Sequence, residues 1–173
     1  TLSSSSAASD VYKRQQLDGK SVVTIEGLTD REKAVYTYAF GECGAVQCGF
    51  CIPGMIISAK ALIDENNNPT ADDVKKAILG NICRCTGYVK IEEGIMLAAK
   101  MFRENLPVPE KDTNAAVGAP LPRVDVEEKA LGTGQYADDI HMEGMIYAKA
   151  LRSKYPRARV DRVDVSKALE HPA

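Results

Sequence analysis

The sequence predicts a mainly α-helical fold: a four-helix bundle, then a linker, then the truncated start of an α+β domain. Three observations support this prediction. Four segments within residues 29–106 carry apolar residues at helical spacing. Four prolines interrupt residues 107–122, which is typical of an extended linker. Residues 123–173 then contain short β-rich runs separated by Gly, Pro and Asp.

The composition limits the possible classes of function. The chain has 173 residues, of which 45% are hydrophobic and 27% charged, as in an ordinary globular protein. Its formal net charge of −2 gives no basic excess for binding nucleic acid or an acidic membrane. Its apolar runs are far shorter than a membrane span, and residues 1–15 show neither a secretory signal nor apolar periodicity. We therefore expect a cytoplasmic protein that begins with a non-native or disordered tail.

A short β-rich segment precedes the bundle. Residues 17–28 combine an Asp-Gly turn with a β-branched run, which predicts a strand followed by a loop. A single strand needs partners, and these are expected upstream. The first helix is predicted to begin at Thr29 or Asp30, with Val35 and Tyr38 on its apolar face.

Three further helices complete the predicted bundle. The second begins near Pro53 and ends at the asparagines of residues 66–68. The third begins at Thr70, which with Asp73 forms a shortened version of the capping box. The fourth lies within residues 89–106. Four amphipathic helices with short connections favour a bundle, and loops at the helix junctions are suited to holding a cofactor.

Cysteines are concentrated at two of these junctions. The first pair is Cys48 and Cys51, and the second is Cys83 and Cys85. In a chain without a secretory signal, clustered cysteines favour metal or redox chemistry over disulfides. An odd total of five cysteines and the short backbone between the second pair also disfavour disulfide bonding. Arg84 lies between two thiols, where it either offsets thiolate charge or is an ordinary surface cation.

The spacing of the cysteines leaves the metal open. Structural zinc also uses four cysteines, commonly as two C-x2-C pairs, and an all-cysteine set equally suits a 2Fe–2S cluster. The second pair is closer than in most zinc ribbons, so the spacing favours iron–sulfur only modestly. A non-redox zinc module that scaffolds a larger assembly is therefore the alternative.

The residues around the cysteines resemble a known family. "GAVQCGFCIPGMIISAKAL" and "PTADDVKKAILGNICRCTGYVKI" are similar to the helical 2Fe–2S domain of the molybdenum hydroxylases, the xanthine dehydrogenase and aldehyde oxidoreductase family. "VVTIEGL" resembles the exit from that family's plant-ferredoxin-like 2Fe–2S domain, so residues 16–28 are assigned to the end of a domain that is otherwise absent. Residues 123–173 resemble the start of the family's large molybdenum-binding subunit.

The resemblance implies a function for residues 29–106 as a helical 2Fe–2S-binding domain. It implies four ligands: Cys48, Cys51, Cys83 and Cys85. It also implies that Gln47 hydrogen-bonds the pterin of the molybdenum cofactor and that the Cys85 sulfur approaches the same pterin. Electrons would pass from the molybdenum–pterin centre through this cluster towards the first 2Fe–2S cluster and an acceptor.

The same resemblance implies partner domains for this chain, and it implies no catalytic residue within it. In the family, the molybdenum centre oxidises a C–H bond of a heterocycle or an aldehyde, with water as the oxygen source. The implied partners are a plant-ferredoxin-like 2Fe–2S domain, the molybdenum-binding domain and an FAD subunit. The fragment alone is expected not to be catalytic.

Other reactive side chains are expected to have ordinary roles. Cys43 lies five residues before the first ligand, where a buried small apolar residue is a better interpretation than a ligand. His141 and His171 are isolated. The adjacent carboxylates of residues 127–128 and 138–139 have no nucleophile or base partner.

Overall fold

The computed structural model describes residues 18, 19, 21–110, 117–119, 121 and 123–170. The chain divides into two compact units, one ending at Gln135 and the other beginning at Tyr136. The predicted tail at residues 1–15 lies outside the described residues, and so does part of the predicted linker.

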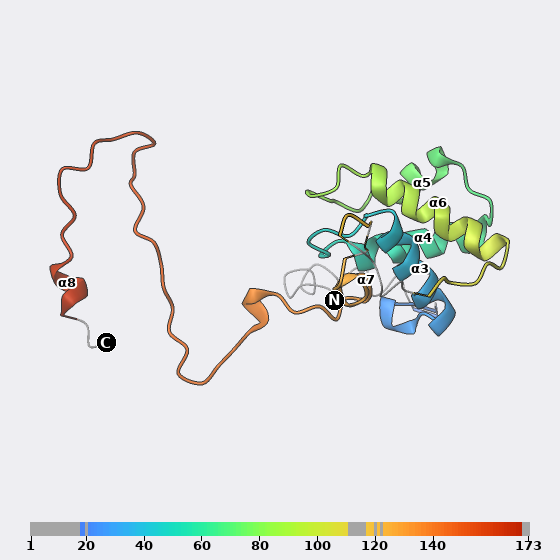
Figure 1. The fold of residues 1–173 in the computed structure, drawn as a ribbon, viewed down its shortest axis with the longest axis horizontal. Coiled ribbons are helices and arrows are strands. Elements are labelled where there is room, and N and C mark those ends of the chain that lie inside the picture. Colours follow the sequence, from blue (N-terminus) through green and yellow to red (C-terminus); the bar gives the residue numbers. More distant parts are fainter. Residues whose placement is uncertain (1–17, 20, 111–116, 120, 122, 171–173) are drawn as a thin grey trace. The chain divides into compact units, whose positions relative to one another are not determined.

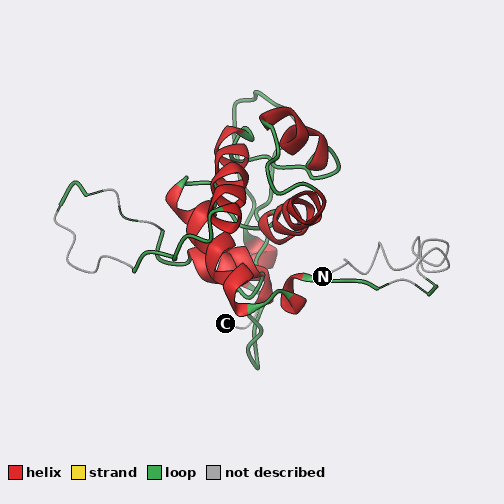
Figure 2. Ribbon diagram, turned by 90° about the vertical axis from the view of Figure 1, so that its right-hand side faces the viewer, coloured by secondary structure: helices red, strands yellow, loops and turns green. Residues whose placement is uncertain are grey.

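Helices account for the regular structure of the described residues (Figure 2). The first unit contains η1 (Ile25–Gly27), α3 (Asp30–Glu42), α4 (Ile52–Glu65), α5 (Ala71–Ala77), α6 (Val89–Arg103) and α7 (Val126–Leu131). The second unit contains η2 (Ala137–Asp139) and α8 (Ser166–Leu169). The mainly α-helical fold class and the four predicted bundle helices are thus confirmed by α3, α4, α5 and α6.

Two of these helices begin with capping boxes: the one at Thr70 was predicted, and at Thr29 the sequence predicted only the start of the helix. The Thr29 hydroxyl accepts from the Glu32 N–H at 3.3 Å, and the Glu32 carboxylate accepts from the Thr29 N–H at 2.7 Å. At the start of α5, Thr70 and Asp73 make the same reciprocal pair at 3.2 and 2.9 Å. Each box satisfies backbone donors that a helix N-terminus otherwise leaves unpaired.

The core lies where α6 packs against α3, α4 and α5 (Figure 1). Its largest fully buried side chains come from these four helices: Tyr36, Phe40, Ile52, Met55, Ile56, Ile91, Ile95, Val35 and Val74. The Tyr36 ring lies 5.3 Å from that of Phe102, tilted by 60°. Tyr36 is therefore fully buried in the core, whereas the predicted Tyr38 is partly buried and packs against the core.

A helix that was not predicted from the sequence packs on this core. The α7 helix contacts α3 and α4, and its Val126 and Ala130 side chains are buried. Gly41 leaves room for the contact, since a Cβ atom there would lie 3.1 Å from a methyl group of Val126. The compact unit therefore extends beyond residue 106, which is the predicted end of the bundle.

The predicted strands are corrected by the structure. Residues 21–24 have no regular structure and lead into η1, although residues 17–28 predicted a strand. Within residues 136–170 no strand is present where three β-rich runs predicted them, and η2 occupies the first run. A β-branched run forms a strand only when a neighbouring strand pairs with its backbone groups. After the third run the chain forms the short helix α8.

None of the helices in the described part of the chain has the length and apolar character needed to cross a bilayer.

Candidate metal centre

Two loops at the same end of the bundle carry the four paired cysteines (Figure 1). The first loop joins α3 to α4 and ends at Cys51, which is the residue before α4. The second loop joins α5 to α6 and carries Cys83 and Cys85. Residues more than thirty positions apart in the sequence are thereby brought together, as the sequence predicted for a shared site.

The thiols meet as two pairs, each made of one cysteine from each loop. The Cys51 thiol lies near enough to the Cys83 thiol to shift its pKa, and the Cys48 and Cys85 thiols are related in the same way. All five cysteines of the chain are free thiols. Among the described residues, no three His, Cys, Asp or Glu side chains gather tightly enough for a single metal ion. The structure thus shows two pairs of thiols that span the two loops.

The pKa values of Cys51 and Cys83, the inner pair of thiols, are shifted in opposite directions. Burial, the hydrogen bond to Cys83 and the nearby thiol charges raise the pKa of Cys51 to about 12. Burial acts in the same direction on Cys83, but hydrogen bonds from Thr86, from backbone N–H groups and from Cys51 outweigh it and lower the pKa of Cys83. Within this pair Cys83 is therefore the more readily ionised sulfur.

The outer pair is more exposed. Cys48 and Cys85 are both exposed, whereas Cys51 and Cys83 are half-buried. The hydrogen bond to Cys48 is the main cause that raises the pKa of Cys85. One thiol pair therefore faces outwards and the other faces the bundle.

The second loop is held by side chains of its own. The Tyr88 hydroxyl accepts from the Cys83 N–H at 2.9 Å and donates to the Asn81 carbonyl at 3.4 Å. Thr86 accepts from the Tyr88 N–H at 3.1 Å and lies 3.1 Å from the Cys83 sulfur. Tyr88 adopts a φ of 72°, which is uncommon for an aromatic residue. These hydrogen bonds offset that strain and fix the backbone around Cys83.

The first loop is held by α7. The Lys129 ammonium donates to the Cys48 carbonyl at 3.3 Å, and it also pairs with Asp125 at 3.4 Å. The aliphatic part of Lys129 covers Gly49: a Cβ atom at that position would lie 2.6 Å from the Lys129 Cβ. Sequence reasoning missed Lys129, although a glycine between two paired cysteines is a signal of close approach by another chain segment.

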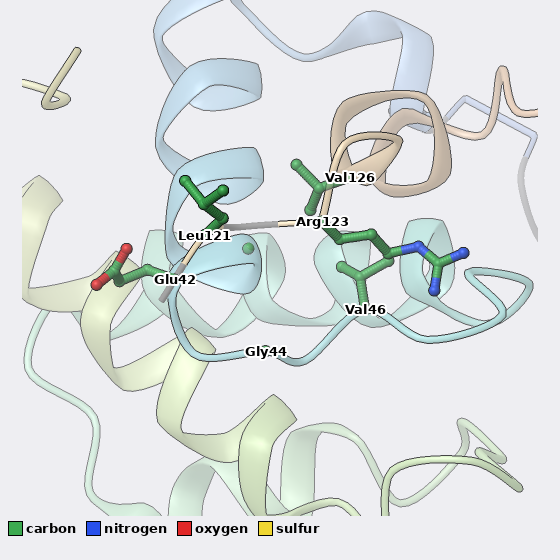
Figure 3. A pocket seen from close by; sticks show the side chains of 7 residues that line it. Glu42, Gly44, Val46, Leu121, Arg123 and Val126 are labelled. Atoms are coloured by element: carbon green, nitrogen blue, oxygen red, sulfur yellow. The ribbon is translucent and has the colours of Figure 1, made fainter. Parts of the chain in front are cut away.

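A pocket of about 410 Å³ lies next to the same loop (Figure 3). Gly44 and Val46 of the first cysteine loop form part of its wall, together with Val126 of α7. Arg123 also lines the pocket, and its guanidinium is engaged with Asp125. The segment that leads into α7 and the first loop therefore line the same pocket.

A comparison with protein families identifies the bundle. Residues 24–96 match the family described as "[2Fe-2S] binding domain", and these residues include both cysteine loops. The match runs from the residue before η1 into α6. The match supports iron–sulfur and gives no support to the zinc scaffold that the cysteine spacing left open.

Relatives of this 2Fe–2S binding domain are parts of oxidoreductases. The chain is 45% identical over 86 residues to the nicotinate dehydrogenase small FeS subunit of Eubacterium barkeri, covering 49% of this chain and 55% of the relative. It is 40% identical over 114 residues to the xanthine dehydrogenase of Dictyostelium discoideum, covering 65% of this chain and 8% of that protein. The chain thus spans about half the length of the first relative and a small part of the second.

Aldehyde oxidoreductases match a longer part of the chain. The aldehyde oxidoreductase of Megalodesulfovibrio gigas is 32% identical over 166 residues, which cover 90% of this chain and 18% of that protein. The solved aldehyde oxidoreductase from Desulfovibrio desulfuricans ATCC 27774 superposes with a TM-score of 0.55 and 37% identity, covering 61% of this chain and 12% of the other. The molybdenum hydroxylase resemblance seen in the sequence is thereby confirmed.

Two further predicted residues, Cys43 and Gln47, lie between the end of α3 and Cys48. Gln47 is exposed next to Cys48. Cys43 is half-buried at the C-terminal cap of α3, where burial and the charge of Glu93 raise its pKa. Their expected roles, contact with a pterin for Gln47 and packing for Cys43, stay predictions.

Proposed function

We propose that this chain supplies the electron-transfer 2Fe–2S segment of a xanthine dehydrogenase-type molybdenum hydroxylase. Four residues would hold the cluster: Cys48, Cys51, Cys83 and Cys85. When bound, a 2Fe–2S cluster takes up and releases one electron at a time. The observation that carries this proposal is the meeting of thiols from two separate loops in two pairs.

The donor set fits a two-iron cluster. Each iron of a 2Fe–2S cluster needs two ligands from the protein. The structure supports a division in which Cys48 and Cys85 hold one iron and Cys51 and Cys83 hold the other. The Thr86 hydroxyl and the backbone N–H groups near Cys83 would hydrogen-bond its sulfur, which is the kind of contact that tunes a cluster.

The exposed thiol pair marks the side on which we propose that a partner docks. Phe50 and Ile82, one from each cysteine loop, are 84% and 86% exposed. Large apolar side chains with so little cover are typical of interaction surfaces when they cluster. Gln47 and Cys85 lie on the same loops, so we propose that the pterin of a molybdenum cofactor approaches there, with Gln47 offering an amide to it.

The proposed partners follow from this placement. Electrons would pass from the molybdenum–pterin centre to this segment, then towards a plant-ferredoxin-like 2Fe–2S domain, with an FAD subunit as a further partner. Residues 16–28 and 123–173 would belong to the ends of the two neighbouring domains. The substrate class would be a heterocycle or an aldehyde, as the relatives' names indicate. Free thiols fit a cytoplasmic location.

Anaerobic reconstitution tests the proposal. The purified chain is incubated with iron and sulfide, desalted, and assayed for iron, visible absorption and the EPR signal after reduction with dithionite. We expect about two irons per chain, a coloured oxidised state and a reduced-state signal. A colourless product that takes up zinc and stays EPR-silent would contradict the proposal, because zinc has no redox chemistry.

A further inference from the structure

We propose that Lys129 is a positioning residue for the cluster site: it holds the first cysteine loop and raises the reduction potential of a cluster bound there. The inference rests on the proposed function, since it assigns a role to α7 in that same site. It concerns a helix outside residues 24–96, which are the residues that match the 2Fe–2S binding domain.

Packing is the first observation that supports this inference. Gly49 adopts a φ of +86°, and a Cβ atom there would lie 2.6, 2.8 and 2.9 Å from the Cβ, Cγ and Cδ atoms of Lys129. Only a residue without a side chain allows so close a contact. The Lys129 side chain is 14% exposed, so its methylene groups are buried against the loop between Cys48 and Cys51.

Placement of the charge is the second observation. The Lys129 ammonium lies 3.3 Å from the carbonyl oxygen of Cys48. Asp125 pairs with it at 3.4 Å, but Asp125 also accepts from Arg123. Two cations, Arg123 and Lys129, therefore lie beside this carboxylate and next to the first cysteine loop. The exposed carboxylates of Glu127 and Glu128 on α7 are screened by water.

A fixed cation has a defined effect on a one-electron centre. Reduction adds one electron and one negative charge, without forming or breaking a bond to the protein. A positive charge nearby stabilises the more negative state, and it does so more strongly when it is shielded from water. Lys129 is both close to a ligand residue and largely buried, so its removal favours the oxidised state.

The test compares reduction potentials of the full chain after anaerobic reconstitution. EPR-monitored titration with dithionite is carried out on the wild type, Lys129→Met, Lys129→Arg and the control Lys75→Met. Lys75 is a half-exposed lysine that also pairs with a carboxylate, Asp72, at 3.7 Å. We expect the equilibrium constant for reduction to fall about tenfold in Lys129→Met, and to stay near the wild-type value in Lys129→Arg and Lys75→Met.

A second variant keeps the test decisive if Lys129→Met takes up no iron. Asp125→Asn leaves Lys129 in place but removes a carboxylate that pairs with it. The equilibrium constant for reduction should therefore rise in this variant. Loss of iron in Lys129→Met but not in Lys129→Arg supports the positioning role.

Equal potentials in the wild type, Lys129→Met and Asp125→Asn overturn the inference and leave the proposed function intact. A wild-type chain that binds no iron overturns both.

Discussion

Gly49 and Gly44 have similar backbone conformations in the first cysteine loop but different neighbouring atoms. Both adopt a left-handed backbone, with φ values of +86° and +64°. Gly44 has no atom within 4 Å of where a Cβ atom would stand, whereas Gly49 faces the side chain of Lys129. The two positions therefore carry the same backbone requirement but different steric requirements.

Alanine substitution at each glycine separates these requirements. Gly44→Ala should lower the free energy of unfolding by about 1 kcal/mol, because only the left-handed backbone becomes unfavourable. Gly49→Ala should lower it by about 2–4 kcal/mol, since the new methyl group also displaces Lys129. Urea denaturation of the metal-free chain, followed by circular dichroism, measures both values. Equal losses would show that Lys129 does not pack on Gly49 in solution.

The cysteines also differ from one another at the scale of single residues. Cys51→Ser or Cys83→Ser should abolish the EPR signal of the reconstituted chain, because either change removes one sulfur of the inner pair. Cys43→Ala should leave iron content unchanged, since Cys43 lies at the end of α3 and belongs to neither thiol pair. EPR and iron analysis of the three variants check this. Loss of iron in Cys43→Ala would mean that the fifth thiol is a ligand.

At the scale of elements, the start of α3 is coupled to the middle of α4. Glu32 closes the capping box of α3 and also receives a hydrogen bond from Lys60 of α4 at 2.5 Å. Lys60 in turn pairs with Asp64 at 2.9 Å. Burial opposes ionisation of Glu32, but the bonds from Lys60 and Thr29 outweigh it, so the pKa of Glu32 lies below its ordinary value of 4.5.

This coupling makes part of the stability depend on pH. A carboxyl group whose pKa is lowered by folding stabilises the fold above its unfolded pKa, and that contribution is lost as the pH falls through the folded pKa. Glu32→Gln should therefore cost about 1 kcal/mol near pH 7 and markedly less near pH 3.5. Urea denaturation at the two pH values measures the difference. The exposed Glu65 provides the control, Glu65→Gln, for which we expect little change at either pH.

Local chemistry explains which elements could be predicted from the sequence. The starts of α3 and α5 depend on residues three positions apart, such as Thr29 with Glu32, so they are visible in the sequence. The β-rich runs around Ile146 and Val160 could form strands only by pairing with neighbouring strands. A high β propensity alone does not produce a hydrogen-bonded sheet. The helix α7 is stabilised by contacts of Val126 and Ala130 with the bundle. These contacts join residues that are far apart in the sequence, so no local pattern predicts them.

For the whole molecule, α7 closes the first compact unit. Val126 and Ala130 are buried against the bundle, although they follow the predicted linker. A chain that ends after Glu110 should lose about 2–4 kcal/mol of unfolding free energy, because the surface that α7 covers becomes exposed. A chain that ends after Gln135 keeps the unit complete and should be as stable as the full chain. Denaturation of both truncated forms tests this, and equal stabilities would contradict it.

The site could be predicted from the sequence only in part. The four paired cysteines stand out by residue type and spacing, and the structure brings their loops together. How the thiols pair, Cys48 with Cys85 and Cys51 with Cys83, depends on the relative orientation of the two loops. Lys129 lies 81 residues from Cys48, and neither its spacing nor its residue type distinguishes it from an ordinary surface lysine.

That separation along the chain has a consequence during protein synthesis. The ribosome releases the first cysteine loop long before it has translated the residues of α7. In the interval the loop has its own turns, but it lacks the contact that α7 provides. A nascent chain would therefore offer the iron-delivery machinery a looser loop than the finished protein does, and the emergence of α7 from the ribosome would end that period.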